Sequence, residues 1–172
     1  MPELIPILTR KAIEDSVVRV ARQISEDYQN QDVVMIGSLK GAFIFMADLV
    51  RYLSIPVKID FIRAASYGSS TSSSGKIHLS EEPELDLKGK NVLIIEDIVD
   101  TGLTLEHLRE HLISLGSCSV KICAFIDKRE RREKQVVIDY VCHVVETGFL
   151  VGYGLDYAEN YRGLPEVYHL KL

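Results

Sequence analysis

Residues 91–104 constrain the fold more than any other part of the sequence. The four apolar residues from Val92 to Ile95 predict a strand that is covered on both faces, as in a parallel sheet. Carboxylates follow, and then a turn with glycine and hydroxyl side chains that opens a helical segment. Open α/β sheets bind their ligands where the strands end. This stretch therefore predicts a parallel α/β sheet with a binding site at its carboxyl edge.

The residues after this strand can bind both cations and anions. Glu96 and Asp97 are expected at its carboxyl end, facing opposite ways, so that one can bind hydroxyl groups and the other a hydrated cation. Asp100-Thr101-Gly102-Leu103-Thr104 offers backbone amides and two hydroxyls at the start of a helix, which suits a monophosphate. The alternative interpretation is a strand that ends in a solvated acidic turn.

The rest of the chain alternates between helical and strand periodicity. Apolar residues between Ile13 and Ile24 predict a helix, and residues 42–53 predict a second one. Short apolar runs predict strands at residues 33–36, 57–62 and 120–126. This pattern is typical of an α/β fold with a doubly wound parallel sheet flanked by helices. We expect one domain over residues 1–172, with its core at about 30–135 and a small hood formed by the N-terminal segment and residues 136–172.

One polar segment interrupts this alternation. Residues 64–76 are rich in serine and glycine and show no apolar periodicity, so we expect them to be mobile. A plain linker is one interpretation. We favour a lid over the site, because a long loop within a compact domain is often an active-site lid. Ser66 and Tyr67 begin this loop, and Tyr67 has a side chain large enough to cover a ligand.

Composition and charge exclude several other classes of protein. The formal net charge of −5 argues against a general attraction to nucleic acid or to an anionic membrane. Three cysteines without paired spacing argue against a disulfide framework and against a zinc site, and we expect them to be reduced core residues. No secretory signal or membrane-spanning run is visible, so we expect a cytoplasmic protein.

Three stretches together resemble a known family. Residues 91–104, with Glu96-Asp97, resemble the phosphoribosyl-diphosphate signature of type I phosphoribosyltransferases, in the form found in the hypoxanthine/guanine branch. Gly37-Ser38-Leu39-Lys40-Gly41 is similar to the pyrophosphate loop of that family, in which the Leu39–Lys40 peptide is often cis. Residues 149–157 are similar to its purine-binding segment. The resemblance covers roughly residues 33–164.

The resemblance implies a role for each site residue. Asp100 would be the general base at N7 of a purine, and Lys128 would donate to its exocyclic O6. Phe149 would stack on the ring beside Leu150, although by itself Phe149 reads as a core residue. Mg²⁺ would be held at Glu96, Asp97 and, through water, Asp156. The remaining substrate contacts would come from Leu39, Lys40, Gly41, Ser66, Tyr67, Thr101, Gly102, Leu103, Thr104 and Arg162.

Two of these residues, Leu103 and Lys128, stand in a sequence context that bears on their assigned roles. Leu103 stands where some relatives carry lysine, so phosphate binding would depend on amides and hydroxyls. Lys128 lies in the densest charged run, residues 127–134, and we expect the other members of that run to form a solvated turn with local ion pairs.

The implied reaction is purine salvage. Phosphoribosyl diphosphate and hypoxanthine or guanine would give a nucleoside monophosphate and pyrophosphate, with Mg²⁺ on the departing pyrophosphate. The alternative is a regulator on the same fold that senses phosphoribosyl diphosphate or binds RNA. Such a regulator need not keep Asp100, Lys128 and Phe149 together, and RNA binding favours a basic face that this acidic chain lacks. Family members are usually homodimers or homotetramers.

Overall fold

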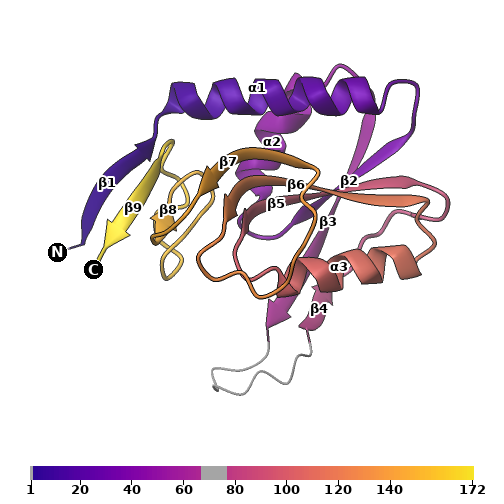
Figure 1. The fold of residues 1–172 in the computed structure, drawn as a ribbon. Coiled ribbons are helices and arrows are strands. Elements are labelled where there is room, and N and C mark those ends of the chain that lie inside the picture. Colours follow the sequence, from indigo (N-terminus) through magenta and orange to yellow (C-terminus); the bar gives the residue numbers. More distant parts are fainter. Residues whose placement is uncertain (1, 67–76) are drawn as a thin grey trace.

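The computed structural model describes residues 2–66 and 77–172, and this part of the chain forms a large sheet, a small sheet and helices that cover the large one (Figure 1). The large sheet has the strand order β4-β3-β2-β5-β6-β7. Its neighbouring strands are parallel, except that β4 is antiparallel to β3 at one edge. The strand bounds are β2 (Val33–Ser38), β3 (Val57–Ser66), β4 (Ile77–Glu81), β5 (Asn91–Val99), β6 (Ser119–Lys128) and β7 (Tyr140–Val145). The prediction of a parallel α/β sheet is confirmed.

Helices cover both faces of the large sheet. α1 (Arg10–Asp27) and α2 (Phe43–Tyr52) pack against each other on one face, and α3 (Leu103–Ser114) covers the other (Figure 1). α1 begins at an N-cap threonine, Thr9, whose hydroxyl accepts a hydrogen bond from the Ala12 amide at 3.2 Å. Its buried residues recur at helical spacing, which presents one continuous apolar stripe to the sheet.

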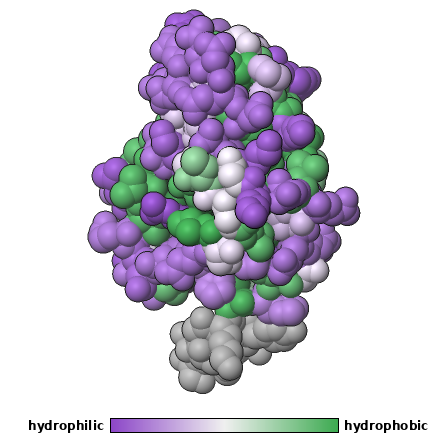
Figure 2. All heavy atoms as spheres, turned by 90° about the vertical axis from the view of Figure 1, so that its right-hand side faces the viewer, coloured by the Kyte–Doolittle hydropathy of each residue, from purple (hydrophilic) through white to green (hydrophobic). Residues whose placement is uncertain are grey.

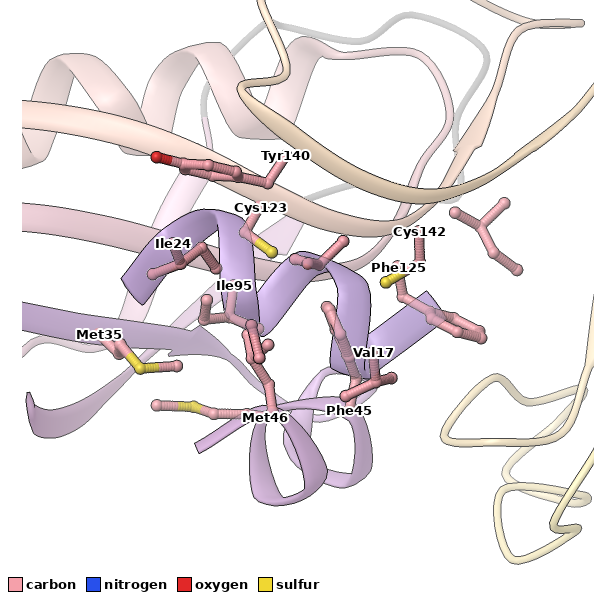
Figure 3. Packing of buried hydrophobic residues seen from close by; sticks show 14 of the residues in the cluster. Val17, Ile24, Met35, Phe45, Met46, Ile95, Cys123, Phe125, Tyr140 and Cys142 are labelled. Atoms are coloured by element: carbon pink, nitrogen blue, oxygen red, sulfur yellow. The ribbon is translucent and has the colours of Figure 1, made fainter. Parts of the chain in front are cut away.

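The strand β5 divides the core into two layers. Leu93 and Ile95 pack into the cluster beneath α1 and α2, whereas Val92 and Ile94 pack into the cluster beneath α3. Successive side chains of a strand point to opposite faces, and both faces are covered here, so the run is apolar without alternation. Figure 3 shows the first layer, in which side chains of the strands meet those of the helices.

The small sheet forms a hood at the carboxyl ends of the parallel strands. It is antiparallel, with the order β1-β9-β8, and it joins the two ends of the chain: β1 (Glu3–Leu8), β8 (Leu150–Val151) and β9 (Val167–Lys171). The arrowheads of β6 and β7 point toward it (Figure 1). The sequence placed all of residues 136–172 in the hood, and this is wrong for β7. That strand pairs with β6 in the large sheet, because its register buries Tyr140 and Cys142 against the core.

Two further boundaries differ from the prediction. β5 continues to Val99, so Glu96 and Asp97 lie within the strand and not beyond it. β3 continues to Ser66 because the unpredicted edge strand β4 pairs with it, which makes the first three residues of the expected loop part of a strand. Tyr67 and the rest of that loop lie outside the described residues.

The opposite end of the sheet carries both hydrophobic and hydrophilic residues (Figure 2). Figure 2 views the molecule from that end, where the parallel strands begin, and shows hydrophobic residues interspersed among hydrophilic ones. Cys123 and Cys142 are buried, as expected, but Cys118 is exposed because it lies in the turn before β6. Within the described ranges, no helix is long and apolar enough to cross a membrane.

Candidate active site

A cavity of about 180 Å³ lies between the carboxyl ends of β5 and β6 and the hood. Three segments that are far apart in the sequence meet around it: the end of β5 with the following turn, the end of β6, and residues 149–156. Predicted site residues that line it are Asp97, Asp100, Lys128, Phe149, Leu150 and Asp156. The cavity therefore brings together the proposed base, the proposed purine contacts and two of the three proposed metal ligands.

The two adjacent carboxylates of β5 lie in a desolvated part of the site. Glu96 is buried, and its Oε1 accepts a hydrogen bond from the Asp97 amide at 3.2 Å. Burial raises the pKa of Glu96 well above its ordinary value, and the neighbouring Asp97 carboxylate acts in the same direction. Burial also raises the pKa of Asp97. A bound cation would stabilise the ionised forms of both groups.

The carboxylates fit Mg²⁺ as partial ligands and not as a complete cage. Asp97 and Asp156 line the same cavity and offer hard oxygen donors. Within the described residues no group of three or more histidine, cysteine or acidic side chains could hold a metal by itself. Mg²⁺ usually binds through one or two carboxylates plus substrate phosphates, and it keeps several waters. The donor set therefore suits a cation that arrives with a phosphorylated substrate.

Asp100 begins the turn that leads from β5 into α3. Its Oδ1 is buried and has no hydrogen-bond partner among the described residues, and its Oδ2 lies 3.5 Å from Arg131 Nη1. Gly102 takes a left-handed conformation, with φ of 84°, which lets the chain enter the helix at Leu103. The Leu103 amide lies 3.4 Å from Thr101 Oγ1. The turn therefore combines an unsatisfied carboxylate oxygen with the N-terminus of a helix.

The loop after β2 lies against the acidic residues of β5. Its Leu39–Lys40 peptide is cis, as the resemblance implied. A side chain at Gly41 would overlap the Asp97 carboxylate, and a side chain at Gly154 would overlap the Gly41 carbonyl. These two glycines allow the loop, β5 and the hood to approach each other closely.

The cations near the hood are paired with acidic side chains. Lys40 Nζ lies 2.9 Å from Glu159 Oε2, and Arg162 Nη2 lies 3.3 Å from the other oxygen of the same carboxylate. These two cations lower the pKa of Glu159. Arg162 also lies 3.1 Å from Asp156 Oδ1 and donates to the Gly154 carbonyl at 2.7 Å. Glu159 therefore occupies the position between two cations that an anionic ligand could take.

Lys128 and Phe149 both line the cavity, in very different environments. The Lys128 side chain is only 9% exposed, and its Nζ lies 3.6 Å from Glu130 Oε2. Phe149 is 46% exposed and contacts Tyr157 edge to face, with ring centroids 5.6 Å apart. The interpretation of Phe149 as a core residue is therefore wrong, because its side chain is exposed and lines the cavity.

The charged run 127–134 is a solvated turn only in part. Arg129, Glu130, Arg131, Glu133 and Lys134 are exposed, as expected. Asp127, by contrast, is buried, and it forms an ion pair with Arg132, whose side chain is only 12% exposed. Nothing in the sequence distinguishes Arg132 from its neighbours Arg129 and Arg131. The one available signal was Asp127, an acidic residue at the end of an apolar strand, which needs a buried partner.

The other predicted residues lie around the cavity without lining it. Leu39, Lys40 and Gly41 lie in the loop after β2, and Thr101, Gly102, Leu103 and Thr104 lie at the start of α3. Ser66 is the last residue of β3 and lies opposite Ile77 of β4, so it does not belong to a free loop. The contact predicted for Tyr67 falls outside the described residues.

Residues 6–158 of the chain match the sequence model of the phosphoribosyl transferase domain family. The chain belongs to this family. The hypoxanthine-guanine phosphoribosyltransferase of Dictyostelium discoideum is 43% identical over 169 residues, which cover 96% of this chain and 94% of that protein. The enzyme of the same name from Aquifex aeolicus is 42% identical and covers 94% and 92%. A crystal structure of a hypoxanthine-guanine phosphoribosyltransferase from Bacillus anthracis superposes with a TM-score of 0.93 at 36% identity, with both chains fully covered.

Proposed function

We propose that this protein transfers 5-phosphoribosyl from phosphoribosyl diphosphate to N9 of hypoxanthine or guanine, which gives inosine or guanosine monophosphate and pyrophosphate. The single observation that carries the proposal is the cavity in which Asp97, Asp100, Lys128, Phe149 and Asp156 meet. Each of these groups answers a need of the reaction. The near-full-length similarity to hypoxanthine-guanine phosphoribosyltransferases supports the same conclusion.

Phe149 and Lys128 together bind and orient the purine. The exposed ring of Phe149 stacks on the base, and the Lys128 ammonium donates to O6. Lys128 is shielded from water, so a base that offers an amino group at this position would leave the ammonium without an acceptor. The pocket therefore favours 6-oxopurines over adenine.

Asp100 removes the proton that the base must lose. Its unpartnered Oδ1 accepts the proton from N7 while N9 bonds to the anomeric carbon and the bond to pyrophosphate breaks. The transition state has oxocarbenium character, so acidic groups beside the ribose stabilise it. Glu96 and Asp97 hold the ribose hydroxyls on that side, in a position fixed by β5.

The phosphate groups bind at the edges of the cavity. The amides and hydroxyls of residues 101–104 hold the 5′-phosphate at the N-terminus of α3. Lys40 and Arg162 hold the pyrophosphate after it displaces Glu159 from between them. Mg²⁺ would be held at Asp97 and Asp156, with support from Glu96, and would supply neutralisation of the leaving pyrophosphate. Ser66 and Tyr67 belong to the segment proposed to close over the site.

The test is direct incubation of the protein with phosphoribosyl diphosphate, Mg²⁺ and one purine at a time, with the nucleotide product measured by chromatography. Nucleotide from hypoxanthine or guanine, with far less from adenine, supports the proposal. If none of the purines reacts, the alternative of a regulator that binds phosphoribosyl diphosphate replaces it. A cytoplasmic location and a homodimeric or homotetrameric assembly belong to the same proposal, and light scattering of the purified protein tests the latter.

A further inference from the structure

Arg132 has an environment unlike that of any ordinary loop arginine. Its side chain is only 12% exposed, and its guanidinium forms an ion pair with the equally buried Asp127. It also donates to three main-chain carbonyls: Nε to Asp100 at 2.9 Å, and Nη2 to Val99 and Lys128 at 3.2 Å each. One side chain thus joins the end of β5 to the end of β6.

Two of these carbonyls belong to the last paired residues of β5 and β6, and the third, that of Asp100, lies beyond the sheet. The pairing of β5 with β6 ends at Val99 and Asp127. Lys128 is still held by β7, opposite Val145, but Asp100 lies beyond the last paired residue of β5. Buried carbonyls need donors, and at this point Arg132 provides them in place of a neighbouring strand.

The loop that carries Arg132 adds backbone contacts to the same turn. The amides of Glu133 and Lys134 donate to the Thr101 carbonyl at 2.9 and 3.0 Å. A side chain at Gly102 would press against the Lys134 carbonyl. Residues 132–134 therefore support the Asp100–Gly102 turn, and they do not line the cavity.

We propose that Arg132 is the positioning residue that sets the placement of Asp100 relative to Lys128, and so helps to determine purine specificity. The inference rests on the proposed function, in which Asp100 contacts N7 and Lys128 contacts O6, which lie side by side on one edge of the purine. Both contacts form at once only if the two strand ends hold a fixed separation. A buried guanidinium fixes that separation because its donors are arranged in a rigid plane, whereas a lysine ammonium is a flexible point charge.

The test compares Arg132→Lys with a matched control, Arg129→Lys. Arg129 also donates to Asp127, at 3.2 Å, but its side chain is 57% exposed and it has no carbonyl contact in the described structure. Calorimetry measures binding of inosine monophosphate and adenosine monophosphate to each protein. Turnover with hypoxanthine and with adenine is measured in parallel, and thermal unfolding monitors the folded fraction.

We expect Arg132→Lys to weaken inosine monophosphate by about tenfold or more, the typical effect of losing one charge-assisted hydrogen bond. Adenosine monophosphate should change by less than about twofold, so the preference for the 6-oxopurine narrows. kcat with hypoxanthine should fall while the KM for phosphoribosyl diphosphate stays nearly constant. Arg129→Lys should match the wild type in all of these measurements.

A purely structural Arg132 predicts a different result. Arg132→Lys would then lower the unfolding temperature and the active fraction, but the folded protein would keep its preference between the two nucleotides, and the inference would be overturned. If Arg132→Lys does not fold, Asp127→Asn removes the charge that holds the guanidinium while leaving its carbonyl acceptors in place, and the same narrowing of preference is required. A wild type that binds inosine monophosphate without turnover would count against the proposed reaction but not against this positioning role. A wild type that binds neither nucleotide overturns both.

Discussion

Two charged runs end neighbouring strands of the same sheet, and they use their charges in opposite ways. Residues 96–100 at the end of β5 direct Asp97 and Asp100 into the cavity. Residues 127–132 at the end of β6 turn Asp127 and Arg132 inward, where they hold each other and the main chain. Within the second run, Lys128 and Arg131 are the residues that line the cavity.

The difference follows from where each run leaves the sheet. β5 lies in the middle, between β2 and β6, and its end opens directly under the hood. The chain after β6 folds back across the end of β5, so Arg132 meets main-chain carbonyls at the ends of both strands. Charge density in a sequence therefore does not show whether a group faces a ligand or the backbone. Substitutions in the first run should affect chemistry, and those in the second should affect geometry.

The largest expected effect, removal of divalent cations, tests the first run as a whole. The paired carboxylates of β5 are desolvated, and burial raises the pKa of both, so a cation beside them would favour their ionised forms. We expect excess chelator to abolish nucleotide formation, and added Mg²⁺ to restore it. Full activity in the chelator would mean that the acidic end of β5 serves only the ribose.

Asp100→Asn should give the next largest effect. The amide keeps the shape of the side chain but cannot accept a proton, so kcat should fall by roughly 10²- to 10⁴-fold. Binding of phosphoribosyl diphosphate, measured by calorimetry, should remain nearly unchanged. Thr104→Val is the matched contrast at the other end of the turn, and it should raise the KM for phosphoribosyl diphosphate with little change in kcat. A normal kcat in Asp100→Asn would remove the general base from the first run.

Lys128→Gln tests the one buried cation of the second run that faces the cavity. Glutamine keeps a donor but loses the charge, and the loss of one charge-assisted hydrogen bond corresponds to roughly tenfold to hundredfold in kcat/KM for hypoxanthine. Adenine should be affected much less. An equal loss for both purines would show that Lys128, like Asp127, serves the structure of the run and not the recognition of O6.

The sequence predicts best the part of the site whose residues follow each other in one continuous segment. The strand, the acidic pair and the turn into α3 follow each other between residues 91 and 104, so local periodicity was sufficient to place them. The exact end of β5 was missed because pairing with β6, and not the composition of β5, decides where the strand stops. The antiparallel edge strand β4 was missed because its burial is only partial.

Long-range contacts account for what the sequence could not provide. In the sequence, Gly41 and Gly154 resemble ordinary turn residues. In the fold, Gly41 lies against Asp97, and Gly154 lies against the Gly41 carbonyl. Arg132 resembles its exposed neighbours in the sequence, and it differs from them only because the folded chain crosses the end of β5. In both cases the residue type is constrained by contacts with residues that are distant in the sequence. The local sequence pattern therefore cannot reveal this constraint.

Glu159→Gln should give the smallest effect, and it extends the comparison to a third charged segment. Glu159 pairs with Lys40 and Arg162 at 2.9 and 3.3 Å, but its side chain is 64% exposed, so these pairs are screened by solvent. Because pyrophosphate must displace this carboxylate, the neutral variant should bind pyrophosphate a few-fold more tightly at low salt, and the gain should shrink as salt is added. Inhibition of nucleotide formation by pyrophosphate, measured at two ionic strengths, checks this. Unchanged inhibition at both would place the pyrophosphate away from Lys40 and Arg162, and would leave the cations of the hood with a purely structural role like that of Asp127.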